Sequence, residues 1–123
     1  MQQYQIDFQQ LRIKHILFKS KVRSVLYGGK QDVDFFSQRG PIMEWFRVTG
    51  GEHYSQEPEL RMLHRTHQTL TSHALQLFRV YDSGRIEQAH EGLKEIELGS
   101  EQFLTTLSQF EKRLSSLEMS DSF

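Results

Sequence analysis

Apolar residues recur at alternating intervals of three and four along three long stretches of this 123-residue chain. The stretches cover residues 8–25, 60–81 and 86–117. This spacing places the apolar residues of each stretch on one face of an α-helix, and the alternation of a β-strand cannot produce it. The sequence therefore predicts an all-α protein built on three long amphipathic helices.

Glycine and proline separate these stretches, because both residues interrupt regular helices. They cluster in four places: "YGGK" (27–30), "RGP" (39–41), "TGGEHYSQEP" (49–58) and "DSGR" (82–85). Short connections between neighbouring helices are typical of an antiparallel bundle. We therefore expect a four-helix-bundle-like fold that forms one domain over residues 1–123, with an ordered core over about residues 5–118.

A fourth, short helix is predicted between the second and third clusters. Pro41 suits the first position of a helix, where its missing N–H costs nothing. The residues that follow include Ile42, Trp45 and Phe46, which are large enough to close one side of the bundle. The predicted architecture is therefore three long helices and one short helix that carries Trp45.

Charge and composition limit the classes of function. The 15 Lys and Arg residues balance 16 Asp and Glu residues, which argues against nucleic acid or an anionic membrane as a partner. The chain has no cysteine, which excludes disulfides, thiolate metal ligands and a cysteine nucleophile, and fits a reducing compartment. No apolar run approaches the roughly 18 residues of a membrane span. We expect a cytoplasmic protein.

Motifs of the common hydrolase and phosphate-binding sites do not occur in the sequence. It contains no His-Glu-x-x-His, no Gly-x-Ser-x-Gly and no phosphate-cradling glycine loop. A di-iron bundle needs inward Glu-x-x-His pairs, and the one such spacing, Glu87 to His90, lies mainly off the apolar stripe. We therefore expect a protein that is not an enzyme.

The apolar residues of each predicted long helix form a stripe along one face. Each of these three stripes contains one polar residue at a core position: His15, His67 and Ser100. A buried polar group without a partner costs about 1–3 kcal/mol. Two inward histidines can meet this requirement by binding a metal ion or by hydrogen bonds, and residue types alone leave both interpretations open. Ser100 either orients one of the imidazoles by a hydrogen bond or allows close helix packing.

Further donors lie near these positions. His64 precedes His67 by three residues, a spacing at which two side chains on one helix can share a metal ion. Glu44 on the short helix is a candidate carboxylate ligand, and His53 lies in a connection that periodicity does not constrain. His73 and His90 fall outside the stripes and are expected at the surface.

Three segments, taken in order, resemble the chemoreceptor zinc-binding (CZB) domain family. "RIKHILFKSKVRSVLYGG" (12–29) is similar to the family's first helix, in which the histidine, here His15, is a zinc ligand. "GPIMEWFRVTGG" (40–51) resembles its Cys-x-x-Gly-x-Trp segment, with Trp45 and Gly50 in place. "PELRMLHRTHQTLTSHA" (58–74) resembles the helix that brings two histidine ligands four residues apart, the first of which falls on His67.

The sequence departs from this pattern at the ligands themselves. Gly40 stands at the position of the family's cysteine, Met43 at that of its glycine and Thr71 at that of its second histidine. Zinc sites usually take four ligands, so His15 and His67 alone predict weak zinc binding or none. The resemblance also implies that switching through a thiol cannot occur in this chain.

The resemblance implies a bacterial, homodimeric sensory or regulatory module. We expect a stand-alone module of this kind, which would act in trans on a signalling partner such as a chemoreceptor or a diguanylate cyclase. One alternative is a protein that binds divalent metal, zinc in particular, through a site rebuilt with His64 or Glu44. Another is a structural helical adaptor unrelated to signalling.

Overall fold

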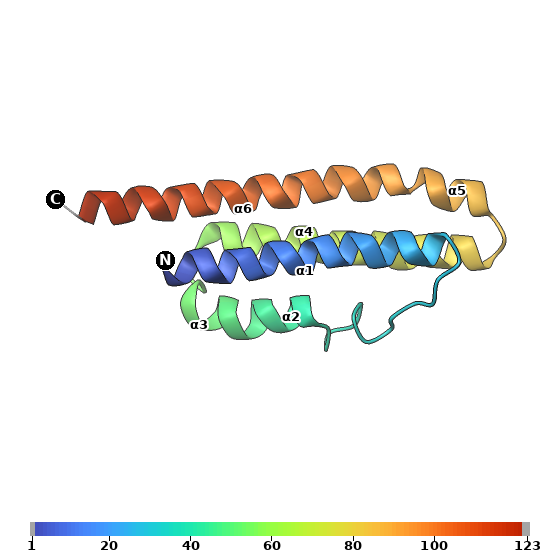
Figure 1. Ribbon diagram of the computed structural model, residues 1–123, viewed down its shortest axis with the longest axis horizontal. Coiled ribbons are helices and arrows are strands. Elements are labelled where there is room, and N and C mark those ends of the chain that lie inside the picture. The colour runs from blue at the N-terminus through green and yellow to red at the C-terminus, as the bar shows by residue number, and fades with distance from the viewer. Residues whose placement is uncertain (1, 122–123) are drawn as a thin grey trace.

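The computed structural model describes residues 2–121, and within that range the regular structure is entirely helical. Figure 1 shows three long helices, α1, α4 and α6, lying side by side with a short helical segment. The elements are α1 (Gln3–Leu26), α2 (Pro41–Trp45), η1 (Phe46–Gly50), α3 (Gly51–His53), α4 (Pro58–Asp82), α5 (Ile86–Glu91) and α6 (Leu93–Asp121). The predicted all-α bundle is confirmed, while residues 1, 122 and 123 of the expected domain lie outside the described range.

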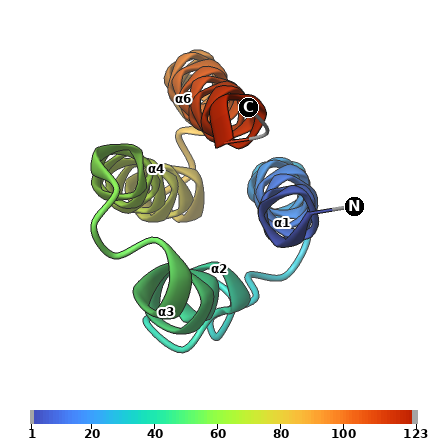
Figure 2. The same cartoon turned by 90° about the vertical axis from the view of Figure 1, so that its left-hand side faces the viewer.

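The chain alternates in direction along the bundle. In Figure 1, α1 and α4 run one way, and the α2–α3 segment and α6 run the other. The end view in Figure 2 places α1, α6, α4 and the α2–α3 segment at the corners of a square. Each long helix therefore presents one face to a shared interior, as the amphipathic pattern requires.

Buried apolar side chains from every corner fill this interior. The largest fully buried ones are Phe8, Phe18, Phe78, Phe103, Phe110, Leu11, Leu26, Ile42, Leu63, Leu70, Ile96 and Leu107. The predicted stripes are confirmed along most of their length but shift near their ends.

In α4 the buried residue after Ala74 is Phe78, whereas Leu77 and Tyr81, which continue the alternating spacing of the 60–81 stretch, are only half-buried. The ends of the third stripe, Ile86 and Leu117, are exposed. A helix has 3.6 residues per turn, so a strict 3–4 alternation, which averages 3.5, drifts by about 20° in each heptad. The core position in α4 consequently moves forward by one residue.

The last predicted helix is two helices, and Gly92 separates them. A Cβ atom at Gly92 would lie 2.2 Å from Cδ2 of Leu77, and one at Gly99 would lie 2.5 Å from Cδ2 of Leu70. The missing side chains therefore allow the final segment to approach α4 closely. The apolar period continues across the break, which is why periodicity alone could not locate it.

Two expectations about the connections were wrong. The connection over residues 27–40 is long and not short. Its Phe35 and Phe36 are buried, and they pack the connection against the bundle. The ring of Phe36 meets Phe18 and Phe78 edge-on, with centroids 5.6 and 5.2 Å apart. Gly50 and Gly51 were expected in a turn, but they continue the short helix instead. Gly50 is the last residue of the π-helical turn η1 and Gly51 is the first residue of α3. Gly50 is buried against Leu60.

A buried carboxylate joins α1 to the short helical segment. Tyr54 donates its hydroxyl to Oδ2 of Asp7 at 2.7 Å, and Gln3 donates to Oδ1 at 2.9 Å. Nε1 of Trp45 donates to the backbone carbonyl of Asp7 at 3.1 Å. Burial, together with the nearby Asp7, raises the pKa of Tyr54 and keeps its hydroxyl a donor. Trp45 thus closes the bundle as expected, and Asp7 fixes its position.

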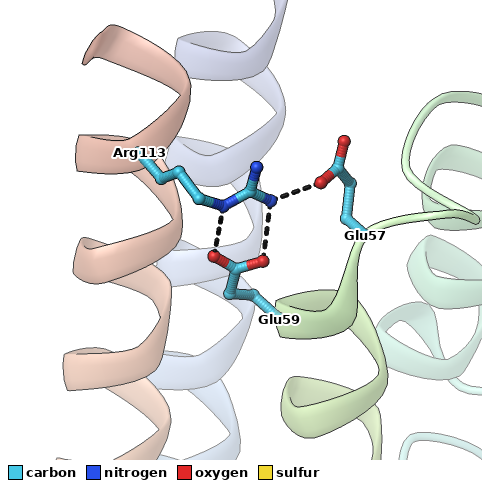
Figure 3. A network of polar contacts seen from close by, with 3 residues as sticks. All are labelled: Glu57, Glu59 and Arg113. Atoms are coloured by element: carbon cyan, nitrogen blue, oxygen red, sulfur yellow. Dashed lines mark hydrogen bonds and ion pairs between the residues drawn. The ribbon is translucent and has the colours of Figure 1, made fainter. Parts of the chain in front are cut away.

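An ion-pair cluster joins α6 to the beginning of α4 (Figure 3). The guanidinium of Arg113 donates to both carboxylate oxygens of Glu59, at 2.6 and 2.7 Å, and also to Glu57. The hydrogen bond to Arg113 lowers the pKa of Glu59. A bidentate ion pair of this kind holds the two side chains in one relative orientation. Both glutamates also lie at the N-terminal end of α4, where the helix dipole favours negative charge.

Replacing Tyr54→Phe is expected to lower the free energy of unfolding by about 1–3 kcal/mol, because it leaves the buried Asp7 carboxylate without one donor. Chemical denaturation at neutral pH measures this difference. Tyr4→Phe is the matched control, since its hydroxyl donates to Glu118 at the surface and its loss should cost about 0.5 kcal/mol or less. Equal losses in the two variants would contradict the assigned role of Asp7.

Candidate functional site

The two inward histidines lie in the middle of the bundle. His15 comes from α1 and is completely buried, and His67 comes from α4 with 4% of its surface exposed. His64, one turn before His67, is half-buried. The structure therefore brings the three predicted metal ligands to the interior side of α1 and α4.

Two residues of α6, Ser100 and Phe103, hold the ring of His15 in place. Its Nε2 and Oγ of Ser100 lie 2.6 Å apart and share a buried hydrogen bond. The ring of Phe103, one turn further along α6, stacks on the imidazole with centroids 4.4 Å apart. Of the two roles foreseen for Ser100, the structure contains the hydrogen bond. The other ring nitrogen, Nδ1, is buried and has no hydrogen-bond partner among the described residues.

His67 has a weaker polar partner. Its Nε2 lies 3.4 Å from Oγ1 of Thr71, one turn later on the same helix. Thr71, which stands where the resemblance would place a second histidine, therefore contacts His67. Phe18 meets the imidazole edge-on at 5.4 Å between centroids, and Phe46 lies over it at 6.0 Å. Nδ1 of His67, like that of His15, is buried without a partner in the described part of the chain.

His64 shares an aromatic neighbour with His67. The ring of Phe46 lies 4.9 Å from that of His64, so η1 covers both histidines of α4. Nε2 of His64 is also buried, and no described group bonds to it. Sequence reasoning did not identify this aromatic enclosure, although the position of Phe46 directly after Trp45 was a usable signal.

Burial determines the protonation of these rings. It lowers the pKa of His15 to about 4 and that of His67 to about 3, since an apolar interior disfavours the charged imidazolium. Burial also lowers the pKa of His64. All three imidazoles are consequently neutral at pH 7, which is the form that binds metal ions.

The remaining candidates lie away from this cluster. Glu44 is on the exposed side of α2, so it does not bring a carboxylate to the two histidines. His53 and His73 are both exposed, which confirms the expectation for His73. His90, expected at the surface, is half-buried instead. Its Nε2 donates to the carbonyl of Leu26 and its ring stacks on Tyr27 at 4.3 Å, which covers the end of α1.

Gly40, which stands where the resemblance would place a cysteine, is closely enclosed. A Cβ atom at this position would lie 2.0 Å from the carbonyl oxygen and 2.8 Å from the carbonyl carbon of Phe35. Both are backbone atoms that cannot move aside as a side chain can. A thiolate therefore cannot be supplied here unless the 31–40 segment moves.

These residues do not fit a closed zinc site. Such a site takes four ligands in a tetrahedral arrangement. Within residues 2–121, no group of three or more His, Asp or Glu side chains is arranged to hold a metal ion. The unpartnered nitrogens of His15, His64 and His67 are suitable donors, but each comes from a neutral ring, the chain has no cysteine, and no carboxylate of the described residues completes a metal-binding group with them.

Stability should fall as the pH is lowered from 7 to 5. The pKa values of His15 and His67 are lower in the folded than in the unfolded chain, so the unfolded chain binds more protons below about pH 6.5. Their contribution is complete above pH 6.5 and is lost as the pH falls towards 4 and 3. Each histidine should account for about 2 kcal/mol by pH 5.

Denaturation at both pH values measures this loss. His67→Leu should reduce the pH dependence, and His73→Leu, which changes an exposed ring, should leave it unaltered. A wild-type free energy of unfolding that does not change from pH 7 to pH 5 would contradict the neutral, buried state of the pair.

Comparison with family models, curated proteins and solved structures found no match to this chain. The CZB resemblance therefore remains a hypothesis carried by the three quoted segments. No helix within residues 2–121 is both long and apolar enough to cross a membrane. The fold and the site are therefore described from the residues of this chain alone. These residues form a helical bundle with three neutral histidines on its interior side.

Proposed function

We propose that this chain is a non-enzymatic regulatory module of CZB type that acts on a signalling partner in trans, with a zinc site that is weakened or lost. The partner would be a protein such as a chemoreceptor or a diguanylate cyclase. The observation that carries the proposal is the pair His15 and His67, buried at the positions that the resemblance assigns to ligands.

The surroundings of this pair support a weakened site. Ser100 and Thr71 place hydroxyls beside Nε2 of the two rings, which leaves only Nδ1 of each ring without a partner among the described residues. The backbone of Phe35 leaves no room for a thiolate at Gly40. Two neutral imidazoles alone bind zinc less tightly than a four-ligand set containing a thiolate.

A rebuilt metal site is the second candidate, and one observation favours it. Nε2 of His64 is buried and unpartnered, and the ring shares Phe46 with His67. Rotation of the histidine side chains would be required to bring three nitrogens to one ion. Glu44 is not part of this candidate, because it lies on the exposed side of its helix.

Metal content distinguishes these candidates. Protein purified without a metal-binding tag and analysed by elemental mass spectrometry should contain well under one equivalent of zinc, and its melting temperature should not change in a chelator. A rebuilt site would instead give one equivalent that is lost in His64→Ala and retained in His73→Ala. One equivalent retained in both variants but lost in His15→Ala would contradict both the weakened and the rebuilt site.

The regulatory role requires a separate measurement. Deleting the coding sequence should change the chemotactic response or the cyclic diguanylate level of the cell that encodes it, and the wild-type sequence should restore it. If neither quantity changes while the protein is expressed, the proposed role in signalling is wrong and a structural adaptor becomes the better interpretation.

A further inference from the structure

The outward face of α1 carries large apolar side chains that the core does not use. Ile13 and Ile16 have 59% and 61% of their surfaces exposed, and Leu17 has 44%. Figure 2 shows α1 at a corner of the bundle, with its outer side uncovered by any other element. Exposed apolar residues that stand singly are common, but neighbouring ones on one helix face indicate a contact surface. We call Ile13, Ile16 and Leu17 the α1 patch.

The stretch of chain that contains the α1 patch is basic. Residues 8–31 include six Lys and Arg residues and no Asp or Glu: Arg12, Lys14, Lys19, Lys21, Arg23 and Lys30. The whole chain has a net charge of −1, so its charges are balanced in number but separated in position. The overall balance that argued against an anionic membrane therefore does not hold at α1.

Helix geometry places the basic residues along both edges of the α1 patch. Consecutive residues lie about 100° apart around a helix, so Arg12 and Lys14 stand on either side of Ile13. The same arrangement recurs seven residues later around Ser20, with a lysine before it and a lysine after it. An apolar stripe bordered by Lys and Arg is typical of a helix that lies in the interface of an anionic membrane.

Ion pairs within the chain neutralise only part of this positive charge. Three carboxylates pair with four of the six basic residues: Arg12 with Glu111, Lys21 with Asp32, and both Lys19 and Arg23 with Glu97. Lys14 and Lys30 form no ion pair with a described residue. The positive charges around the patch therefore exceed their carboxylate partners by three.

A groove beside the α1 patch suits a lipid headgroup. It has a volume of about 470 Å³ and is lined by Ile16, Lys19, Ser20, Arg23, Ser24 and Tyr27. The ammonium, guanidinium and hydroxyl groups among these side chains can all donate hydrogen bonds to phosphate oxygens. The side chain of Arg23 is 62% exposed beside its pair with Glu97, and a guanidinium has five N–H donors. Donors of Arg23 consequently remain available to a headgroup.

We propose that this chain docks on an anionic lipid surface through α1, with the α1 patch inserted at headgroup level and the flanking basic side chains against lipid phosphates. Lys and Arg can bury their stems along an apolar surface while their charged ends stay in water. The patch lies on a convex helix, and mobile lipids adapt to such a shape, whereas an acidic protein would need a matching concave site. The proposal goes beyond the regulatory function proposed above and does not depend on the histidines.

Binding to vesicles of known composition tests the docking. Each Lys or Arg near an anionic surface strengthens binding about fivefold, so the excess of three charges should favour anionic vesicles by roughly a hundredfold. The whole chain should float with vesicles of phosphatidylcholine mixed with phosphatidylglycerol at low salt, and added salt should release it. Equal binding to vesicles of phosphatidylcholine alone overturns the proposal. So does a chain that ignores both vesicles but binds soluble polyglutamate, because the patch would then serve an acidic protein.

Paired substitutions test the two parts of the contact. Ile13→Ser should weaken binding to the anionic vesicles about tenfold, and Lys14→Gln about fivefold. Leu98→Ser and Lys94→Gln are the matched controls, since they make the same kinds of change at exposed positions of α6 and should leave binding nearly unaltered. Circular dichroism checks that each variant is folded. Binding that Ile13→Ser leaves intact, or that Lys94→Gln weakens as much as Lys14→Gln, contradicts the proposed insertion of α1.

The absence of cysteine allows the docked face to be located directly. A polarity-sensitive fluorophore is attached to Ser20→Cys, beside the α1 patch, or to Ser72→Cys, an exposed position on α4 at the opposite corner of the bundle. On anionic vesicles the emission of the label at position 20 should shift to the blue, and that of the label at position 72 should not. A shift at position 72 alone, or at neither position, overturns the proposal.

Discussion

The structure depends on the burial of one apolar face from each of α1, α4 and α6 around a common interior. Phe8 and Phe18 from α1 and Phe103 and Phe110 from α6 are among the largest side chains buried there. An interior of this kind is close-packed, so a polar group within it must have a partner or weaken the fold. This requirement explains the hydrogen bond between His15 and Ser100, and the three donors around Asp7 and its carbonyl.

The same constraint determines the chemistry of the histidines. Burial keeps the rings of His15 and His67 neutral, and aromatic neighbours on three elements exclude water from them. Neutral imidazoles are good metal ligands, yet a doubly charged ion in an apolar interior also needs an anionic ligand to offset its desolvation. The described residues around this pair provide hydroxyls in place of a thiolate or a carboxylate. We therefore regard the pair chiefly as part of the core.

The two sides of α1 differ in burial. Its inward face carries His15 together with Phe8 and Phe18, and its outward face carries the exposed Ile13 and Ile16. The ion pairs of Arg12, Lys19 and Arg23 with α6 separate the two faces and fix the rotation of α1 in the bundle.

The sequence by itself determined the helical class, the three long helices, the short helix at Pro41 and the inward direction of His15, His67 and Ser100. It could do so because helix periodicity is a local property of the chain. Only the tertiary structure decided that Ser100 pairs with His15, that Phe46 covers both histidines of α4 and that Phe35 blocks position 40. It also revealed the break at Gly92 and the partner of His90. These features depend on which segments meet in space and which faces stay uncovered, and residue spacing along one helix does not contain that information.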